Sequence, residues 1–241
     1  MSGHSKWAKV KHQKAVADPK RGKAFSKLIA LITVAAREGA DVGSNPKLRM
    51  AIDKAKEIGM PKENIEKAIK RGSGEEDGDK KLEEIIYEAY APGGSAMLIQ
   101  TITDNKNRTL AELRHILQKN QSKLAETGSV LWLFKETGKI ILPKKVWNDD
   151  LSLEMIEKGA EEIKEEGKDI IIYTPSQNLS LMKDSLEKFI DPSLIKTELD
   201  FINQQEIIVS DEETKNQLEK LFNDLDEHSD VEEIYSNTKI I

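Results

Sequence analysis

Cysteine is absent from this 241-residue chain, and no stretch of it stays apolar for eighteen residues. The first absence excludes a disulfide scaffold, thiol catalysis and zinc or iron–sulfur centres bound by cysteine. The second excludes a membrane-spanning helix. The first residues are polar and basic instead of forming the apolar segment of a secretory signal. We therefore expect a cytoplasmic protein without a membrane partner.

Aromatic residues make up only 5% of the chain, whereas 38% is hydrophobic and 33% is charged. The hydrophobic fraction suffices for a buried core, and the length corresponds to one or two domains of about 150 residues. The net charge of −6 hides a division, because residues 1–72 hold 17 Lys and Arg against 7 Asp and Glu, while residues 73–241 hold 20 against 36. This asymmetry predicts that the basic first segment binds a polyanion and that the acidic residues 73–241 would repel it.

The first segment divides into a basic arm and a helical region. Residues 1–17 show no wide apolar face, so we expect a mobile arm there. Three short amphipathic helices should follow over residues 18–39, 45–59 and 61–72. Each begins at Asp, Asn or Pro and ends at glycine, residue types that favour those helix ends, with Gly72 as the last of them. The pattern predicts a small helical bundle.

Beyond a Gly- and Asp-rich linker at residues 72–79, the pattern changes to short strands alternating with helices. A Pro-Gly-Gly turn should join the first two strands into a hairpin, and a capping box from Thr109 to Glu112 should begin the next helix. The order predicts an α+β fold with two ferredoxin-like domains, one inserted in the other. Strands are expected at residues 83–90, 96–103, 130–134, 139–142, 169–173, 195–202, 206–209 and 232–236, and the later helices at about 150–165, 179–189 and 212–225.

Catalytic and metal-binding motifs are missing from the sequence. The four histidines are scattered, and no zinc pairing, nucleophile elbow, phosphate-binding loop or dinucleotide fingerprint occurs. The aspartates at 77 and 79, and at 224 and 226, lack the spacing of a calcium loop. We therefore expect no enzymatic activity, no catalytic residue, no metal, no cofactor and no small-molecule substrate.

The basic segment carries the strongest functional signal. Cations that neutralise phosphates release counterions, which makes binding fall steeply with salt. Trp7 and His12 could stack on unpaired bases, although packing of Trp7 on the helices is an equally favoured interpretation, and the lysines could form a solvated tail. The candidate nucleic-acid-binding residues of this segment are Lys6, Trp7, Lys9, Lys11, His12, Lys14, Lys20, Arg21, Lys23 and Lys27.

A second candidate surface is the segment Thr103–Thr109, which leads into a helix N-terminus. Free N–H groups and the helix dipole favour anions at such a position. An Asn-rich turn that only shapes the helix entry is at least as consistent with this pattern. The residues that would contact a phosphate or an RNA backbone here are Asn105, Lys106, Asn107 and Arg108.

Motifs within the first 135 residues resemble the YebC/PmpR family. Together these motifs are very specific, and the rest of the chain agrees with the family in length and element order. Ala89 and Ala91 stand where the family often has glycine, a departure that concerns strand packing alone. The matching segments are Gly3–Trp7, Lys11–His12, Asp18–Lys27, Met60–Ile65, Ala68–Gly72, Tyr87–Gly94, Thr103–Thr109 and Gly128–Val130 followed by Phe134.

The resemblance implies three domains: a helical domain with its basic arm at 1–75, an α+β domain formed by 80–135 with 204–241, and a second α+β domain inserted at 136–203. Members of the family are described as probable transcriptional regulators that bind DNA. Mitochondrial relatives act as translational activators of a cytochrome oxidase subunit, and some bacterial relatives are described as ribosome-associated factors that relieve stalled elongation. No catalytic residue or cofactor is known for the family.

Three functional hypotheses stay open at this point. A DNA-binding transcription regulator agrees with the family's usual description, although no recognition helix is evident. A translation factor that binds ribosomal RNA or tRNA agrees with a flexible Lys-rich arm that contains Trp and His. A scaffold whose acidic domains bind another protein is the third. The sequence alone separates neither DNA from ribosomal RNA nor a monomer from an oligomer.

Overall fold

The computed structural model describes residues 18–75 and 81–241, and for residues 18–21 it describes the backbone alone. By compactness the chain divides into two units. Unit 1 combines Met1–Phe134 with Asn203–Ile241, and unit 2 is Lys135–Ile202. Within the described ranges, no helix combines the length and the apolar character needed to cross a membrane.

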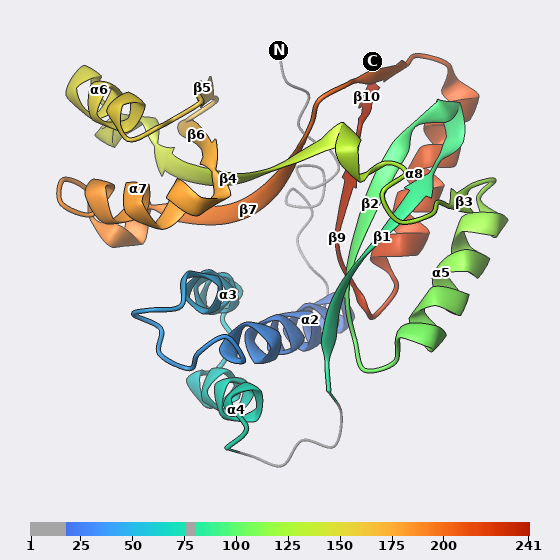
Figure 1. The fold of residues 1–241 in the computed structure, drawn as a ribbon, viewed down its shortest axis with the longest axis horizontal. Coiled ribbons are helices and arrows are strands. Elements are labelled where there is room, and N and C mark those ends of the chain that lie inside the picture. The colour runs from blue at the N-terminus through green and yellow to red at the C-terminus, as the bar shows by residue number, and fades with distance from the viewer. Residues whose placement is uncertain (1–17, 76–80) are drawn as a thin grey trace. The chain divides into compact units, whose positions relative to one another are not determined.

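Three helices of unit 1 form the predicted bundle (Figure 1). They are α2 (Asp18–Ala36), α3 (Pro46–Glu57) and α4 (Lys62–Ser73). The side chain of Asn45 caps α3 by accepting a hydrogen bond from the N–H of Leu48 at 3.0 Å. The apolar faces of the three helices pack together, and the buried core consists of Ile32, Ala35, Ala36, Leu48, Ala51, Ile52, Ala55, Met60, Ile65 and Ala68.

Gly72 lies inside α4, so the prediction that it ends the helix is wrong. The helix continues to Ser73, and Gly74 adopts the left-handed conformation (φ 80°) that closes a helix. Gly72 serves packing instead, because a Cβ at this position would lie 2.3 Å from the carbonyl oxygen of Thr33 and 2.6 Å from the Cβ of Ala36. The sequence therefore has glycine where the backbones of α2 and α4 touch.

Replacing Gly72 by alanine should lower the free energy of unfolding by about 2–3 kcal/mol, the usual cost of forcing an extra carbon into a packed interior. Gly22→Ala in α2 is the matched control, because a Cβ there meets nothing within 4 Å. That change should raise stability by up to about 1 kcal/mol through helix propensity. Urea unfolding followed by circular dichroism measures both. Equal stability of the two variants would disprove the close approach at Gly72.

The sheet of unit 1 has four antiparallel strands in the order β3-β1-β2-β9. The predicted hairpin is confirmed: β1 (Glu83–Tyr90) pairs with β2 (Ala96–Thr103) across the 3₁₀ turn η1 (Pro92–Gly94). The outer strands are β3 (Lys123–Leu124) and β9 (Val231–Ser236). Because β9 comes from the end of the chain, the C-terminal segment completes a sheet that the hairpin begins.

Two helices, α5 (Lys106–Lys119) and α8 (Glu212–Asp226), cover this sheet. A further short parallel pair consists of β8 (Ile207–Val209) and β10 (Thr238–Ile240). The strands and the two helices share one core, which places the N-terminus of α5 and the start of β9 in the same body. Its buried side chains are Ala89, Ala91, Met97, Ile99, Leu113, Leu117, Val209, Leu218, Leu221, Phe222, Leu225, Val231 and Ile234.

Unit 2 has the order βαββαβ, which is the ferredoxin-like pattern. Its four strands lie in the order β5-β6-β4-β7, and β6 is antiparallel to both β4 and β5. The α+β class predicted from the sequence is therefore confirmed. The elements are β4 (Phe134–Pro143), α6 (Asp149–Glu157), β5 (Glu162–Glu166), β6 (Asp169–Pro175), α7 (Leu179–Leu186) and β7 (Lys196–Asn203), with short 3₁₀ turns η3 (Lys144–Val146), η4 (Ser176–Asn178) and η5 (Pro192–Leu194).

Two sequence-based assignments near unit 2 are wrong. The helix expected over 150–165 ends at Glu157, because Gly159 takes a positive φ of 94°, and the acidic run behind it forms β5. Glutamate and lysine favour helices by propensity, but pairing with β6 overrides that preference. The strand expected at 130–134 is instead the 3₁₀ turn η2 (Leu131–Leu133), followed by β4.

Candidate nucleic-acid interface

The whole predicted basic arm, residues 1–17, lies outside the part of the chain that the structure describes. This holds for Lys6, Trp7, Lys9, Lys11, His12 and Lys14. Lys20 and Arg21 belong to α2, where the structure describes their backbone. The proposed contact of these eight residues with nucleic acid therefore stays a prediction.

Lys23 and Lys27 lie on α2, and both reach the C-terminal end of α8. The ammonium of Lys23 donates a hydrogen bond to the carbonyl oxygen of Glu227. That of Lys27 donates to the carbonyl oxygen of Asp226 at 3.2 Å and lies 3.9 Å from a carboxylate oxygen of the same residue. Cations are favoured at a helix C-terminus because the last carbonyls are unpaired and the dipole is negative there. These two lysines thus join α2 to α8 inside unit 1.

The second candidate surface is the first turn of α5, which begins earlier than the capping box suggested. Asn105 is the N-cap, and its side chain accepts a hydrogen bond from the N–H of Arg108 at 3.1 Å. Thr109, expected to cap the helix, is buried within its first turn. Lys106 and Asn107 are exposed. The side chain of Asn105 therefore shapes the start of the helix, whereas Lys106 and Asn107 face solvent.

Arg108 lies at the centre of an ion-pair network. Its guanidinium is 2.6 Å from a carboxylate oxygen of Asp230 and 3.0 Å from one of Asp104. The hydroxyl of Thr109 also donates to Asp230 at 2.6 Å and contacts that of Thr103 at 2.8 Å. These contacts tie the start of α5 to the residue before β9. The guanidinium of Arg108 is therefore occupied by other side chains of unit 1. The sequence does not reveal this pairing, because Asp230 lies 122 positions further along the chain.

The carboxylate of Asp230 is buried, which by itself raises its pKa, but the hydrogen bonds from Thr109 and Arg108 outweigh burial and hold the pKa below the usual value. The charged form is thus the one that the fold stabilises. Because the folded pKa lies below the unfolded pKa, this contribution is complete well above pH 4 and is lost as the pH falls through the folded pKa.

Asp230→Asn should therefore destabilise unit 1 by about 1–3 kcal/mol at pH 7, since it weakens two charge-assisted hydrogen bonds. The difference from wild type should shrink as the pH falls below about 4, where the carboxylate of the unfolded chain is protonated. Urea midpoints measured from pH 7 to pH 3 test this. Glu219→Gln, at an exposed position of α8, is the control and should change little. A difference that is constant over the whole range would refute the role of the charge.

Glu112, His228 and Asp230 place three potential ligand atoms within 4.8 Å of one another. All three groups already have partners: His228 Nε2 is 2.8 Å from Glu112, and His228 Nδ1 accepts the N–H of Asp230 at 3.1 Å. The guanidinium of Arg108 lies 2.6 Å from Asp230 and 3.9 Å from Glu112. A guanidinium cation thus already lies against both carboxylates. We assign the cluster to the ion-pair network that anchors α5.

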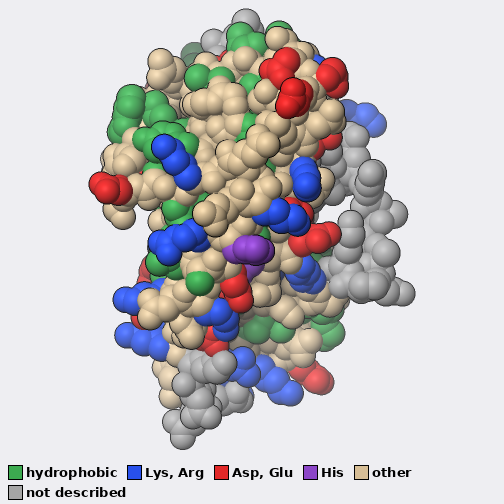
Figure 2. Space-filling model, turned by 90° about the vertical axis from the view of Figure 1, so that its right-hand side faces the viewer, with side chains coloured by type: hydrophobic (Ala, Val, Ile, Leu, Met, Phe, Trp, Pro, Cys, Tyr) green, Lys and Arg blue, Asp and Glu red, His purple; other side chains and the backbone are tan. Residues whose placement is uncertain are grey.

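The side of the molecule that carries α5 is rich in cations. Figure 2 shows Lys and Arg side chains spread over the middle and lower parts of this face, with acidic side chains and a histidine among them. On α5 itself, Arg108 and Lys119 have acidic partners. The face is therefore partly neutralised, and its capacity for anions depends on the cations that remain unpaired.

Two family models together match most of the chain. The model described as the TACO1/YebC protein N-terminal domain matches residues 5–75, and the one described as the TACO1/YebC second and third domain matches residues 82–238. The first match contains the basic segment and the helical bundle. The second contains both four-stranded sheets.

Proteins and a solved structure from other organisms are similar over much of their length. A protein of Fervidobacterium nodosum named probable transcriptional regulatory protein is 53% identical over 191 residues, covering 78% of this chain and 75% of the relative. A protein of the same name from Thermotoga petrophila is 51% identical with the same coverage. The crystal structure of a conserved hypothetical protein from Aquifex aeolicus is 43% identical, has a TM-score of 0.84 and covers 98% of both chains.

Proposed function

Because the chain belongs to the TACO1/YebC family, we propose that it is a regulator of gene expression that acts by binding duplex DNA in the cytoplasm, without catalysis. The name shared by its relatives, probable transcriptional regulatory protein, supports the regulatory part of this proposal. The DNA-binding part rests on charge.

The observation that carries the proposal is the division of charge along the chain. Residues 1–72 hold 17 Lys and Arg against 7 Asp and Glu. Phosphate contacts supply most of the affinity of a protein for DNA irrespective of sequence. The acidic remainder would be repelled by the same polyanion. A protein built in this way binds DNA through one end and keeps the other away from it.

We assign these roles to three domains. Residues 1–75 hold the nucleic acid, and the α+β domains, formed by 80–135 with 204–241 and by 136–203, contact other components of the regulatory machinery. Lys6, Lys9, Lys11, Lys14, Lys20 and Arg21 neutralise phosphates. Lys23 and Lys27, whose ammonium groups donate to the C-terminal end of α8, contribute through the field that they add to the surface of α2.

A translation factor that binds ribosomal RNA or tRNA is the second candidate. Trp7 and His12 stand among the lysines of the arm, and aromatic rings next to cations suit stacking on unpaired bases. Duplex DNA offers no such bases, so this feature favours RNA. The two functions also differ in the partner with which the protein should travel in a cell extract.

Titration of fluorescent duplex DNA at several salt concentrations, together with sedimentation of ribosomes from a lysate, tests the proposal. If about five to eight phosphates are neutralised, log K should fall with log salt with a slope of about −4 to −7. A selection from genomic fragments should enrich one duplex above the non-specific background. If no duplex is enriched and the protein sediments with ribosomes at moderate salt, the translation function replaces the proposed one.

A further inference from the structure

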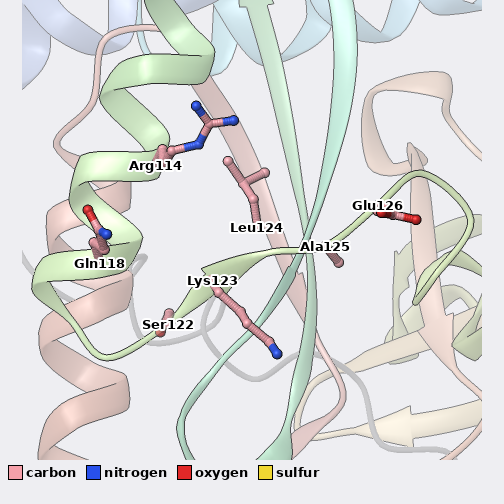
Figure 3. Close-up of a pocket in the computed structure, with 7 residues that line it drawn as sticks. All are labelled: Arg114, Gln118, Ser122, Lys123, Leu124, Ala125 and Glu126. Carbon is pink, nitrogen blue, oxygen red and sulfur yellow. The ribbon is translucent and has the colours of Figure 1, made fainter.

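A pocket of about 400 Å³ opens between the C-terminal half of α5 and β3 (Figure 3). This volume lies within the range of ligand sites, but such sites usually have mostly apolar walls. Here only two of the lining side chains are apolar. The lining residues are Arg114, Gln118, Ser122, Lys123, Leu124, Ala125 and Glu126. The walls therefore suit a polar, hydrated ligand.

Two cations line this pocket without an acidic partner among the residues that the structure describes. Arg114 and Lys123 are exposed, and no carboxylate of the described chain lies within ion-pair distance of either. Two other cations of α5 differ, because Arg108 pairs with Asp230 at 2.6 Å and Lys119 with Asp224 at 3.1 Å. Arg114 and Lys123 thus leave positive charge at the pocket that no carboxylate of the described residues neutralises.

The two cations point in different directions. Figure 3 shows Arg114 extending from α5 toward Leu124, while Lys123 extends from β3 away from Arg114, and the carboxylate of Glu126 points away from both. One small anion could not contact both cations in this arrangement. Two anionic groups connected by a spacer could contact one cation each.

Tyr90 positions Lys123. The two residues are paired in the register of β1 and β3, and the ammonium lies 5.5 Å from the centre of the tyrosine ring. A cation over an exposed aromatic ring gains about 0.5–1 kcal/mol. This contact holds the ammonium at the pocket while leaving its hydrogen-bond donors to solvent or to a ligand.

We propose that the pocket between α5 and β3 holds the sugar–phosphate backbone of single-stranded nucleic acid, with Arg114 and Lys123 on two different phosphates. The proposal goes beyond the proposed function, because it adds a site for single strands to the basic arm proposed for duplex DNA. A polymer with repeated phosphates supplies the two linked anions that the diverging cations require. A recess between a helix and a strand admits an extended single strand more readily than a duplex.

The surface of α5 continues from this pocket toward the other candidate residues. Asn107, Ala111, Arg114 and Gln118 recur at spacings of three and four residues, so they share one face of the helix, and all four are exposed. A strand seated in the pocket can therefore follow α5 to its N-terminus. There Asn107 and the neighbouring Lys106 offer the next polar contacts.

The test compares full-length wild type with the double variant Arg114→Gln/Lys123→Gln. Binding of fluorescent 15-nucleotide oligouridylate and oligothymidylate is measured by anisotropy over a range of salt. The variant should bind single strands at least tenfold more weakly, and its log–log salt slope should be shallower by about 1.4, the value for two phosphates of a single strand. Lys145→Gln/Lys168→Gln, at two exposed lysines of unit 2, is the matched control. Comparing the two oligomers identifies RNA or DNA as the preferred strand.

The outcomes separate the pocket from the proposed function. Unchanged single-strand binding by the double variant overturns the pocket, while duplex binding by the same protein leaves the proposed function standing. If wild type binds no duplex, the proposed function fails, and the pocket is then judged by the NMR signal of the Arg114 side-chain N–H with millimolar tetrathymidylate. A shift of this signal that is lost in Lys123→Gln supports the pocket, and an unmoved signal overturns it.

Discussion

Reversing the charges of Lys9, Lys11 and Lys14 together should weaken binding to duplex DNA by about a hundredfold or more near 100 mM salt. Each phosphate contact that is lost removes the counterions that it would have released, and each glutamate adds repulsion from the neighbouring phosphates. The salt slope should become shallower by about 2.7, which corresponds to three phosphates of duplex DNA. Anisotropy titrations at four or five salt concentrations give both values.

The matched control carries the same change in net charge in unit 2. Lys145, Lys168 and Lys188 are exposed there, and their reversal to glutamate should weaken binding much less and leave the slope almost unchanged, because these lysines are not among the proposed phosphate contacts that release counterions. Equal losses in the two triple variants would show that only net charge matters. That result would remove the arm from the proposed interface.

The local patterns of the sequence were sufficient for most elements of the fold. The start of α3 at Asn45 and the hairpin around Pro92–Gly94 both depend on neighbouring residues, so both could be predicted. The wrong predictions concern segments whose conformation depends on contacts with residues far away in the sequence. The run Glu162–Glu166 has the composition of a helix, but it is a strand because β6 offers it a partner. Gly72 was assigned to a helix end by the same local logic, although contact with Thr33 explains it.

The candidate site shows the same limit more strongly. Arg108 has the local setting of an anion-binding residue at a helix N-terminus, yet its partner Asp230 lies far away in the sequence. The sequence likewise does not show that, within the described residues, Arg114 and Lys123 form no ion pair, because acidic residues such as Glu112 and Glu126 stand close to them along the chain. Of the proposed interface, only the basic segment can be identified from the sequence alone, because its positive charge follows from composition rather than from contacts.

Glu88 provides the second large effect, and it concerns a charge that the sequence analysis did not single out. This residue of β1 is only 5% exposed. Its carboxylate accepts hydrogen bonds from the backbone N–H groups of Gly128 at 2.5 Å, Val130 at 2.6 Å and Leu131 at 2.8 Å. Two motifs that are separate in the sequence, Tyr87–Gly94 and Gly128–Val130, are thereby joined. The carboxylate satisfies N–H groups at the start of η2 that the backbone leaves without partners.

Replacing Glu88 by alanine should lower the free energy of unfolding by about 4 kcal/mol. Hydrogen bonds to a charged group contribute about 1.5–3 kcal/mol each, and buried N–H groups left without an acceptor carry a desolvation cost. The loss exceeds that of most single substitutions. Urea unfolding monitored by circular dichroism measures it, and Glu83→Ala, at an exposed position of the same strand, should stay within about 0.5 kcal/mol of wild type.

Glu88→Gln separates hydrogen bonding from packing, because glutamine keeps the shape of the side chain. Its one carbonyl oxygen can still accept from Val130 and Leu131, but its amide group turns a donor toward the N–H of Gly128. The expected loss is therefore about half that of the alanine variant. Amide exchange should speed up at residues 128–131 more than in β2, since the carboxylate stabilises the segment directly. If the glutamine variant is as stable as wild type, the volume of the side chain fixes this segment and the three hydrogen bonds contribute little. If it is only as stable as the alanine variant, the negative charge is the essential feature.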